Sequence, residues 1–209
     1  SEIEKQLGRE IKIANDANCF ALSEASDGAA AGAPVVFGVI VGTGCGGGVV
    51  VHGRVLNGKN GIAGEWGHSP LSDLRDDERP GVHCYCGRWS CVETWLSGTF
   101  LSKQFALRTG RDIPAAQIAA LAESGDLQCA DEMARFEDRM ARALGVVINI
   151  LDPDVIVLGG GVSNIARLYT NVPKLLPKYA ITTEVHTQFV KAKFGDSSGV
   201  RGAAWLNPL

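Results

Sequence analysis

Two short apolar runs, each followed by glycines, constrain the fold of this chain more than any other feature. Residues 35–41 form the run VVFGVIV, and residues 155–158 form the run VIVL. Unbroken apolar runs of this length that are rich in β-branched residues are typical of buried strands. Two shorter strand patterns, at 49–51 and 54–56, follow the first run after a glycine-rich segment. We therefore expect three antiparallel strands in the first part of the chain.

Helical patterns surround these strands. Residues 16–26 predict one helix, further helices are expected from about Glu93, and a long amphipathic helix is expected from about Asp126 to the next proline. A last strand is predicted at 189–194 and a last short helix at 199–206. This order predicts an α/β fold with a mixed sheet and flanking helices. It is the order of a ribonuclease H-like lobe, the half-unit of actin- and hexokinase-type ATPases.

Composition excludes several classes of protein. The 209 residues are 45% hydrophobic and 21% charged, which excludes a wholly disordered chain. A net charge of -3 argues against nucleic acid as the main partner. The longest uncharged apolar stretch, 29–51, is interrupted by glycines and a proline, so we expect no membrane span. No secretory leader is visible, and we expect a cytoplasmic protein. The charged stretch at 72–80 predicts a solvated loop.

Three clustered cysteines provide the strongest chemical pattern. Cys84, Cys86 and Cys91 lie within the eight residues CYCGRWSC. In a reducing compartment such a cluster indicates a metal site rather than disulfides. Three thiolates and one imidazole form a closed tetrahedral set that suits structural Zn²⁺. His68 and His83 are both candidates for the nitrogen ligand.

Two glycine-rich segments are candidates for phosphate or nucleotide binding. The segment 42–48, GTGCGGG, lies between strand patterns, so it is neither a Walker A loop nor a dinucleotide-binding fingerprint. Its backbone N–H groups and the hydroxyl of Thr43 could still bind an anion; the alternative is a plain hairpin turn. The segment 159–161, GGG, follows a buried strand, where ligands of open α/β sheets bind; the alternative is a plain turn.

Several isolated polar residues have the chemistry that a polyol needs. Asn15 and Asp16 stand at a predicted helix start, where Asp16 is either a simple cap or a carboxylate that deprotonates a hydroxyl. Glu65 and Glu93 lie beside glycines and aromatic residues. Carboxylates and amides bind pairs of neighbouring hydroxyls, although each of these residues could equally be a surface group.

Taken together, these motifs resemble the ROK family of sugar kinases and related repressors. The matching segments are IANDAN at 13–18, VGTGCGGGV at 41–49, AGEWGH at 63–68, CYCGRWSCVE at 84–93 and VIVLGGGVS at 155–163. They span nearly the whole chain in the family's order. The sequences around GTGCGGG and GEWGHSPL are most similar to those of the fructokinase and mannokinase branch.

The resemblance implies a role for each candidate residue. Asp16 would be the catalytic base that takes the proton of the primary hydroxyl of the sugar. Asn15, Glu65, His68 and Glu93 would bind the sugar hydroxyls. The zinc ligands implied are His68, Cys84, Cys86 and Cys91, which favours His68 over His83. The residues implied for ATP are Thr43 and Gly44 at the phosphates and Gly159, Gly160 and Gly161 at the adenosine side.

The resemblance also implies partners and a domain organisation. ATP and Mg²⁺ would accompany a hexose, with fructose favoured, and the protein would be a homodimer. Residues 15–209 would form the C-terminal lobe, with the zinc-binding loop at about 57–98. Residues 1–14 would connect to an N-terminal lobe whose Asp-x-Gly-Gly-Thr motif is not found here, so we expect reduced or no activity. The alternative is a non-catalytic sugar-sensing module related to the repressors.

Overall fold

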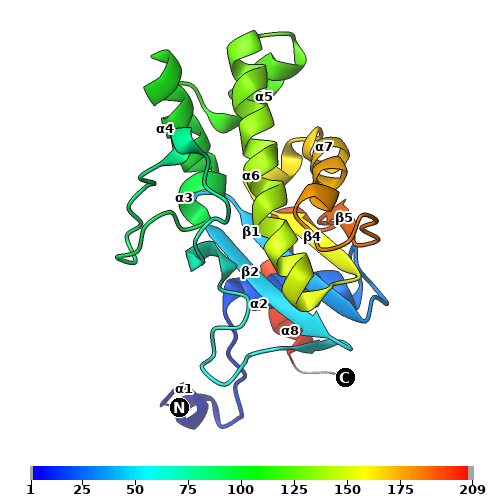
Figure 1. Ribbon diagram of the computed structural model, residues 1–209. Coiled ribbons are helices and arrows are strands. Elements are labelled where there is room, and N and C mark those ends of the chain that lie inside the picture. The colour runs from blue at the N-terminus through cyan, green and yellow to red at the C-terminus, as the bar shows by residue number, and fades with distance from the viewer. Residues whose placement is uncertain (1, 207–209) are drawn as a thin grey trace.

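A five-stranded mixed sheet organises the fold. The structure is a computed structural model that describes residues 2–206 (Figure 1). The sheet has the strand order β3-β2-β1-β4-β5. Its strands are β1 (Val35–Val41), β2 (Cys45–Val51), β3 (Arg54–Val55), β4 (Val155–Gly159) and β5 (Gln188–Lys191). The predicted α/β fold of the actin and hexokinase type is thereby confirmed.

Strand direction places two loops at the same edge of the sheet. β1 pairs antiparallel with β2 but parallel with β4, with Ile40 opposite Gly159. Because the carboxyl ends of parallel strands meet at one edge, the loops after β1 and β4 emerge side by side. The first loop is residues 42–44; the second begins at Gly160, because Gly159 is the last residue of β4.

The predicted boundary of the second strand was wrong. β2 begins at Cys45, so three glycines expected in the turn lie inside the strand, and the turn is confined to 42–44. The reason is close packing against a helix. A Cβ atom on Gly48 would lie 2.5 Å from the carbonyl oxygen of Ala17. Glycine therefore occurs here because a helix crosses the strand at backbone contact.

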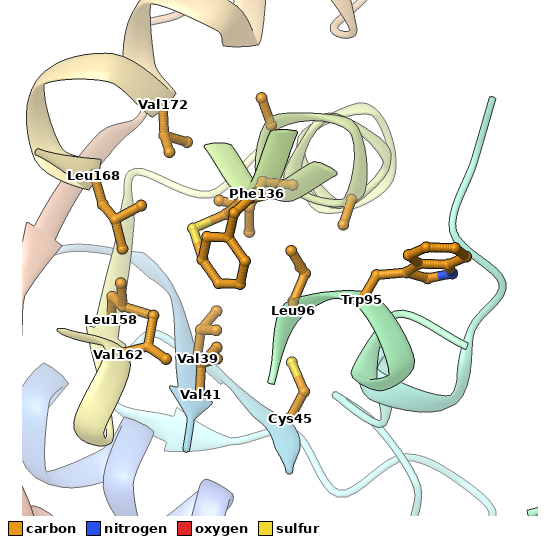
Figure 2. Packing of buried hydrophobic residues seen from close by; sticks show 14 of the residues in the cluster. Val39, Val41, Cys45, Trp95, Leu96, Phe136, Leu158, Val162, Leu168 and Val172 are labelled. Carbon is orange, nitrogen blue, oxygen red and sulfur yellow. The ribbon is translucent and has the colours of Figure 1, made fainter. Parts of the chain in front are cut away.

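Helices cover both faces of the sheet. On one face α2 (Asp16–Ser26) packs against α8 (Ser198–Trp205), in a cluster that includes Phe20, Val36 and Val157. On the other face α6 (Leu127–Leu151) crosses the strands (Figure 1). Figure 2 shows Phe136 of α6 packed among Val39, Leu158, Leu168 and other buried residues of the larger core. Alternate residues of β1 and β4 thus face different helices.

The remaining helices are short. They are α1 (Glu2–Leu7), α3 (Glu93–Leu96), α4 (Gly98–Thr109), α5 (Ala115–Glu123) and α7 (Leu168–Leu175). The predicted last strand and last helix are confirmed with shifted ends, and a 3-10 turn at Gly161–Asn164 precedes α7. Within residues 2–206, no helix is long and apolar enough to cross a membrane.

The charged stretch at 72–80 is anchored in the protein interior rather than solvated throughout. Glu78 is only 5% exposed. Its carboxylate accepts hydrogen bonds from Arg142 at 2.7 and 2.9 Å and from Arg139 at 2.8 Å. Arg142 also donates to the carbonyl oxygen of Asp73 at 2.7 Å. The sequence pattern missed this anchor because the arginines lie on α6, more than sixty residues away.

Replacing Glu78 with glutamine is expected to destabilise the fold by about 3 kcal/mol, because two buried guanidinium groups lose the carboxylate that they share. Arg139 keeps its ion pair with Glu132, and Arg142 keeps its ion pair with Asp138. Hydrogen bonds from these arginines, outweighing the cost of burial, lower the pKa of Glu78 from 4.5 to about 2. A lowered carboxyl pKa stabilises the fold above pH 4.5, and this stabilisation is lost as the pH falls toward 2. Urea unfolding from pH 7 to pH 3 measures both effects.

The neighbouring Asp77 provides a matched control, since its carboxylate forms an exposed ion pair with Arg135. Asp77→Asn should change the free energy of unfolding by less than about 1 kcal/mol. Equal, small effects of Glu78→Gln and Asp77→Asn would contradict the assignment of Glu78 as an anchor of this loop to α6.

Candidate functional site

The N-terminus of α2 presents two of the predicted residues. Asn15 is the N-cap: its Oδ1 accepts from the Asn18 N–H at 2.7 Å. Asp16 is the first helical residue, and its Oδ1 accepts from the Ala17 N–H at 2.9 Å. Both side chains are exposed. Asn15 therefore performs the capping that sequence alone would also assign to Asp16, and the second carboxylate oxygen of Asp16 is left for another partner.

The segment 65–68 lies against the same part of the sheet. Asn15 Nδ2 donates to Glu65 Oε1 at 3.4 Å, which joins the two predicted sugar-binding segments. Trp66 is buried, and its Nε1 donates to the carbonyl oxygen of Gly46 at 2.9 Å. At Gly67 a Cβ atom would collide with the carbonyl oxygen of Cys45. Close contact of Trp66 and Gly67 with β2 thus fixes the positions of their neighbours, Glu65 and His68.

Glu93, at the start of α3, meets the turn after β1. Its Oε2 accepts from the Cys45 N–H at 3.1 Å. A Cβ atom on Gly44 would lie 2.6 Å from the same oxygen. Burial, followed by the charge of Glu93, raises the pKa of the Cys45 thiol well above its ordinary value. Cys45 is therefore a packing residue rather than a nucleophile.

The structure brings the predicted metal ligands together. The donor atoms of His68, Cys84, Cys86 and Cys91 all lie within 4.8 Å of one another. His83 instead pairs with Trp89 in a short bridge, with ring centroids 5.3 Å apart. Among residues 2–206, the group that could hold a metal ion includes His68 and omits His83.

The chemistry of this cluster fits Zn²⁺. Burial raises the pKa of the Cys91 thiol to about 12, whereas the Arg88 N–H lowers the pKa of Cys86. Three adjacent sulfurs cannot ionise together without a cation, since their charges repel. One imidazole and three thiolates complete the tetrahedral coordination that zinc prefers and leave no open position. Such a metal would be structural.

The imidazole of His68 faces two groups. Its Nδ1 lies 3.8 Å from Cys84 Sγ, on the side of the cysteine cluster. Its Nε2 lies 3.1 Å from the hydroxyl of Tyr85, a residue that the sequence did not single out. The charge of Glu93 raises the pKa of this hydroxyl above its ordinary value, so Tyr85 stands within electrostatic reach of a predicted sugar-binding carboxylate.

A cavity of about 680 Å³ lies beside the two glycine loops. Of the predicted nucleotide-binding residues, Thr43 and Gly161 line it. Gly44 lies next to Glu93, whereas Gly159 and Gly160 permit close packing on Phe20 and Val41. The other walls were not predicted: they comprise Gly98, Thr99 and Ser102 of α4, alanines 115, 116, 119 and 120 and Glu123 of α5, and Asn164.

The loop at 42–45 connects this cavity with the acidic side chains. Thr43 lines the cavity, while Gly44 and Cys45 contact Glu93. The alanine run AAQIAA in α5 could have indicated a flat wall, because small side chains let a planar group approach the helix.

Comparison with known proteins identifies relatives of the chain. Residues 1–208 match the model of the ROK family. The chain is 42% identical over 211 aligned residues to an N-acetyl-D-glucosamine kinase of Vibrio vulnificus, covering 99% of this chain and 70% of that protein.

Solved structures show the same architecture. A ROK hexokinase from Thermus thermophilus superposes with a TM-score of 0.85 at 31% identity, over 97% of this chain and 66% of that one. A glucokinase from Streptomyces griseus, solved with glucose and AMPPNP, gives a TM-score of 0.82 at 28% identity, over 98% of this chain and 70% of that one. The chain therefore spans about two thirds of the length of these proteins.

Proposed function

This chain belongs to the ROK family, and on that premise we propose that it transfers the γ-phosphoryl group of ATP to the primary hydroxyl of a hexose. The observation that carries the proposal is the contact of Glu93 with the turn that also lines the nucleotide-sized cavity. Asn15 and Glu65 are joined by a hydrogen bond of their own. A sugar held by Glu93 would lie next to the loop that would bind phosphates.

Asp16 is proposed to be the catalytic base. Phosphoryl transfer has a largely dissociative transition state, so orientation and charge stabilisation matter more than base strength. The carboxylate of Asp16 is exposed and makes one local hydrogen bond. It can therefore orient a hydroxyl and accept its proton as the bond to phosphorus forms. Backbone N–H groups near Thr43 would stabilise the phosphoryl oxygens, and Mg²⁺ enters with ATP.

The proposed sugar-binding residues comprise two carboxylates, one amide and one imidazole. Glu65 and Glu93 accept hydrogen bonds from neighbouring sugar hydroxyls, while Asn15 both donates and accepts. His68 donates from Nε2, the nitrogen that points away from the cysteines. A zinc ion held by His68 and the three cysteines would fix the orientation of that ring.

The cavity is proposed to hold the adenosine end of ATP. Four alanines of α5 form an apolar wall suited to the face of a purine, and Thr99 and Ser102 of α4 add hydroxyls to the lining. Thr43 and Gly161 lie where the phosphates would leave the cavity. Gly44 lies one residue further along, against Glu93.

Among hexoses, we favour N-acetyl-D-glucosamine over the fructose suggested by the sequence motifs. The curated relatives that match at 39–42% identity are named N-acetyl-D-glucosamine kinases. The fructokinase-like motifs at 42–48 and 64–71 lie in the segments proposed to bind the phosphates and the sugar hydroxyls. Such segments determine the reaction type rather than which substituent the bound sugar carries.

A coupled assay for ADP release tests this proposal. With ATP, Mg²⁺ and zinc-loaded protein, we expect N-acetyl-D-glucosamine to give the highest kcat/KM among that sugar, glucose, mannose and fructose. A preference for fructose would contradict the substrate assignment. The kinase proposal would be contradicted if none of the four sugars leads to ADP release and none raises the melting temperature.

The second candidate is a sugar-sensing module without catalysis. It would keep the sugar contacts and the metal site but would not need the carboxylate of Asp16. The presence of that carboxylate, whose second oxygen has no hydrogen-bond partner among residues 2–206, favours the enzyme. Sugar binding without any ADP release, in a protein of the full length of the relatives, would assign it to this second function.

A further inference from the structure

Tyr85 has contacts that neither the zinc site nor the proposed reaction explains. It stands between two of the clustered cysteines and is 82% exposed, yet its hydroxyl lies 3.1 Å from His68 Nε2. The two rings meet edge to face, with centroids 5.3 Å apart and planes at 86°. Trp89, the other exposed aromatic residue of the segment, packs on His83 instead. The position of Tyr85 is therefore specific to the imidazole.

His68 Nε2, the nitrogen that Tyr85 contacts, can donate a hydrogen bond to one acceptor at a time. Because His68 Nδ1 faces the cysteine cluster, ligation through Nδ1 leaves Nε2 as the protonated nitrogen of a neutral ring. This single N–H donates to the oxygen of Tyr85. A sugar hydroxyl that accepts a hydrogen bond from His68 must accept it from the same Nε2–H. The sugar must therefore displace the phenol oxygen of Tyr85 by about one hydrogen-bond length.

Displacement leaves Tyr85 with two unused capacities at the edge of the sugar. The O–H of Tyr85 remains available as a donor, because the phenol oxygen acts as the acceptor toward His68 Nε2. Its ring, largely exposed, remains available for apolar contact. A hydroxyl substituent on the sugar carries neither a carbonyl acceptor nor a methyl group. An acetamido substituent would use both, because it carries a carbonyl acceptor and a methyl group.

We propose that Tyr85 is a specificity-determining residue that contacts the acyl substituent of an N-acetylated hexose. This inference rests on the proposed function, since it concerns the sugar bound beside His68. The phenol donates to the carbonyl oxygen of the substituent, and the ring edge covers its methyl group. A site that hydrogen-bonds a substituent discriminates against sugars that lack it.

Isothermal titration of zinc-loaded protein with two sugars tests the inference. Tyr85→Phe should weaken binding of N-acetyl-D-glucosamine about fivefold to tenfold, because one hydrogen bond is lost. Binding of glucose should change less than about twofold. Tyr85→Ala should weaken N-acetyl-D-glucosamine binding further, again with little effect on glucose. Trp89→Ala, on the same segment, should leave both dissociation constants unchanged.

Zinc content, measured on each variant, reports whether the segment is intact, and it should be equal in all four proteins. An unchanged preference between the two sugars in Tyr85→Phe and Tyr85→Ala would overturn the role of Tyr85. Equal weakening of both sugars would also overturn it and would indicate that Tyr85 only orients His68. Binding of neither sugar by the unaltered chain would contradict the proposed function itself.

Discussion

Replacing Asp16 with asparagine is expected to lower the rate of phosphoryl transfer by about 10²–10⁴-fold while the protein stays folded and binds sugar. The amide keeps the oxygen that accepts from the Ala17 N–H, so the first turn of α2 retains its local hydrogen bond. Asn15 supplies the cap and is not altered. What is lost is the negative charge that accepts the proton of the sugar hydroxyl. ADP release measured at saturating sugar and ATP reports the loss directly.

Asp27 provides the matched control at the other end of the same helix. It is the C-cap of α2, and its carboxylate pairs with Arg201 rather than with the predicted sugar-binding residues. Asp27→Asn removes the same charge from the same helix and should leave kcat within about twofold. Turnover by Asp16→Asn at the rate of the unaltered chain would exclude Asp16 as the base.

Replacing Cys91 with serine is expected to remove the bound metal and to lower the melting temperature by about 10 °C. Cys91 is fully buried and also pairs with Pro70 in a short bridge, so it links the cysteine segment to the segment that carries His68. Without the cation, the remaining sulfurs and the imidazole lose their common partner. Thermal unfolding with and without a chelator measures the contribution of the metal.

Cys129→Ser is the control for the chemical change alone, because Cys129 is equally buried and lies on α6, outside the ligand cluster. The unaltered chain and Cys129→Ser should both lose about 10 °C on chelation, whereas Cys91→Ser should show no response to the chelator. A chelator-independent melting temperature in the unaltered chain would contradict a structural metal at this site.

Local patterns predicted the framework of this fold well. The β-branched run at 35–41, the capped helix at 16–26 and the long amphipathic helix before Pro153 all form as expected, since each is specified by residues close together in sequence. The structure also groups His68 with the three cysteines. The cysteine spacing left both His68 and His83 as candidates, and the resemblance to the ROK family favoured His68. These features needed no knowledge of tertiary contacts.

The missed features depend on partners that are distant in sequence. The glycines of β2 suggested a turn, yet Gly48 is required by the helix that crosses the strand and Gly47 by close contact with Gly64 and Trp66. Glu78 was expected in solvent, but Arg139 and Arg142 of α6 bury it. Tyr85 showed no pattern of its own, and its relation to His68 emerges only when the cysteine segment folds back. In each case the decisive contact crosses between elements.

Sugar binding that depends on the metal is the most direct test of this account. The melting temperature should be recorded against the concentration of N-acetyl-D-glucosamine, with metal content determined on the same samples. We expect about one zinc per chain and a melting temperature that rises with the logarithm of sugar concentration, an increase that disappears after the metal is stripped. A chain free of metal as purified, or one whose melting temperature responds equally to the sugar with and without zinc, would contradict the account.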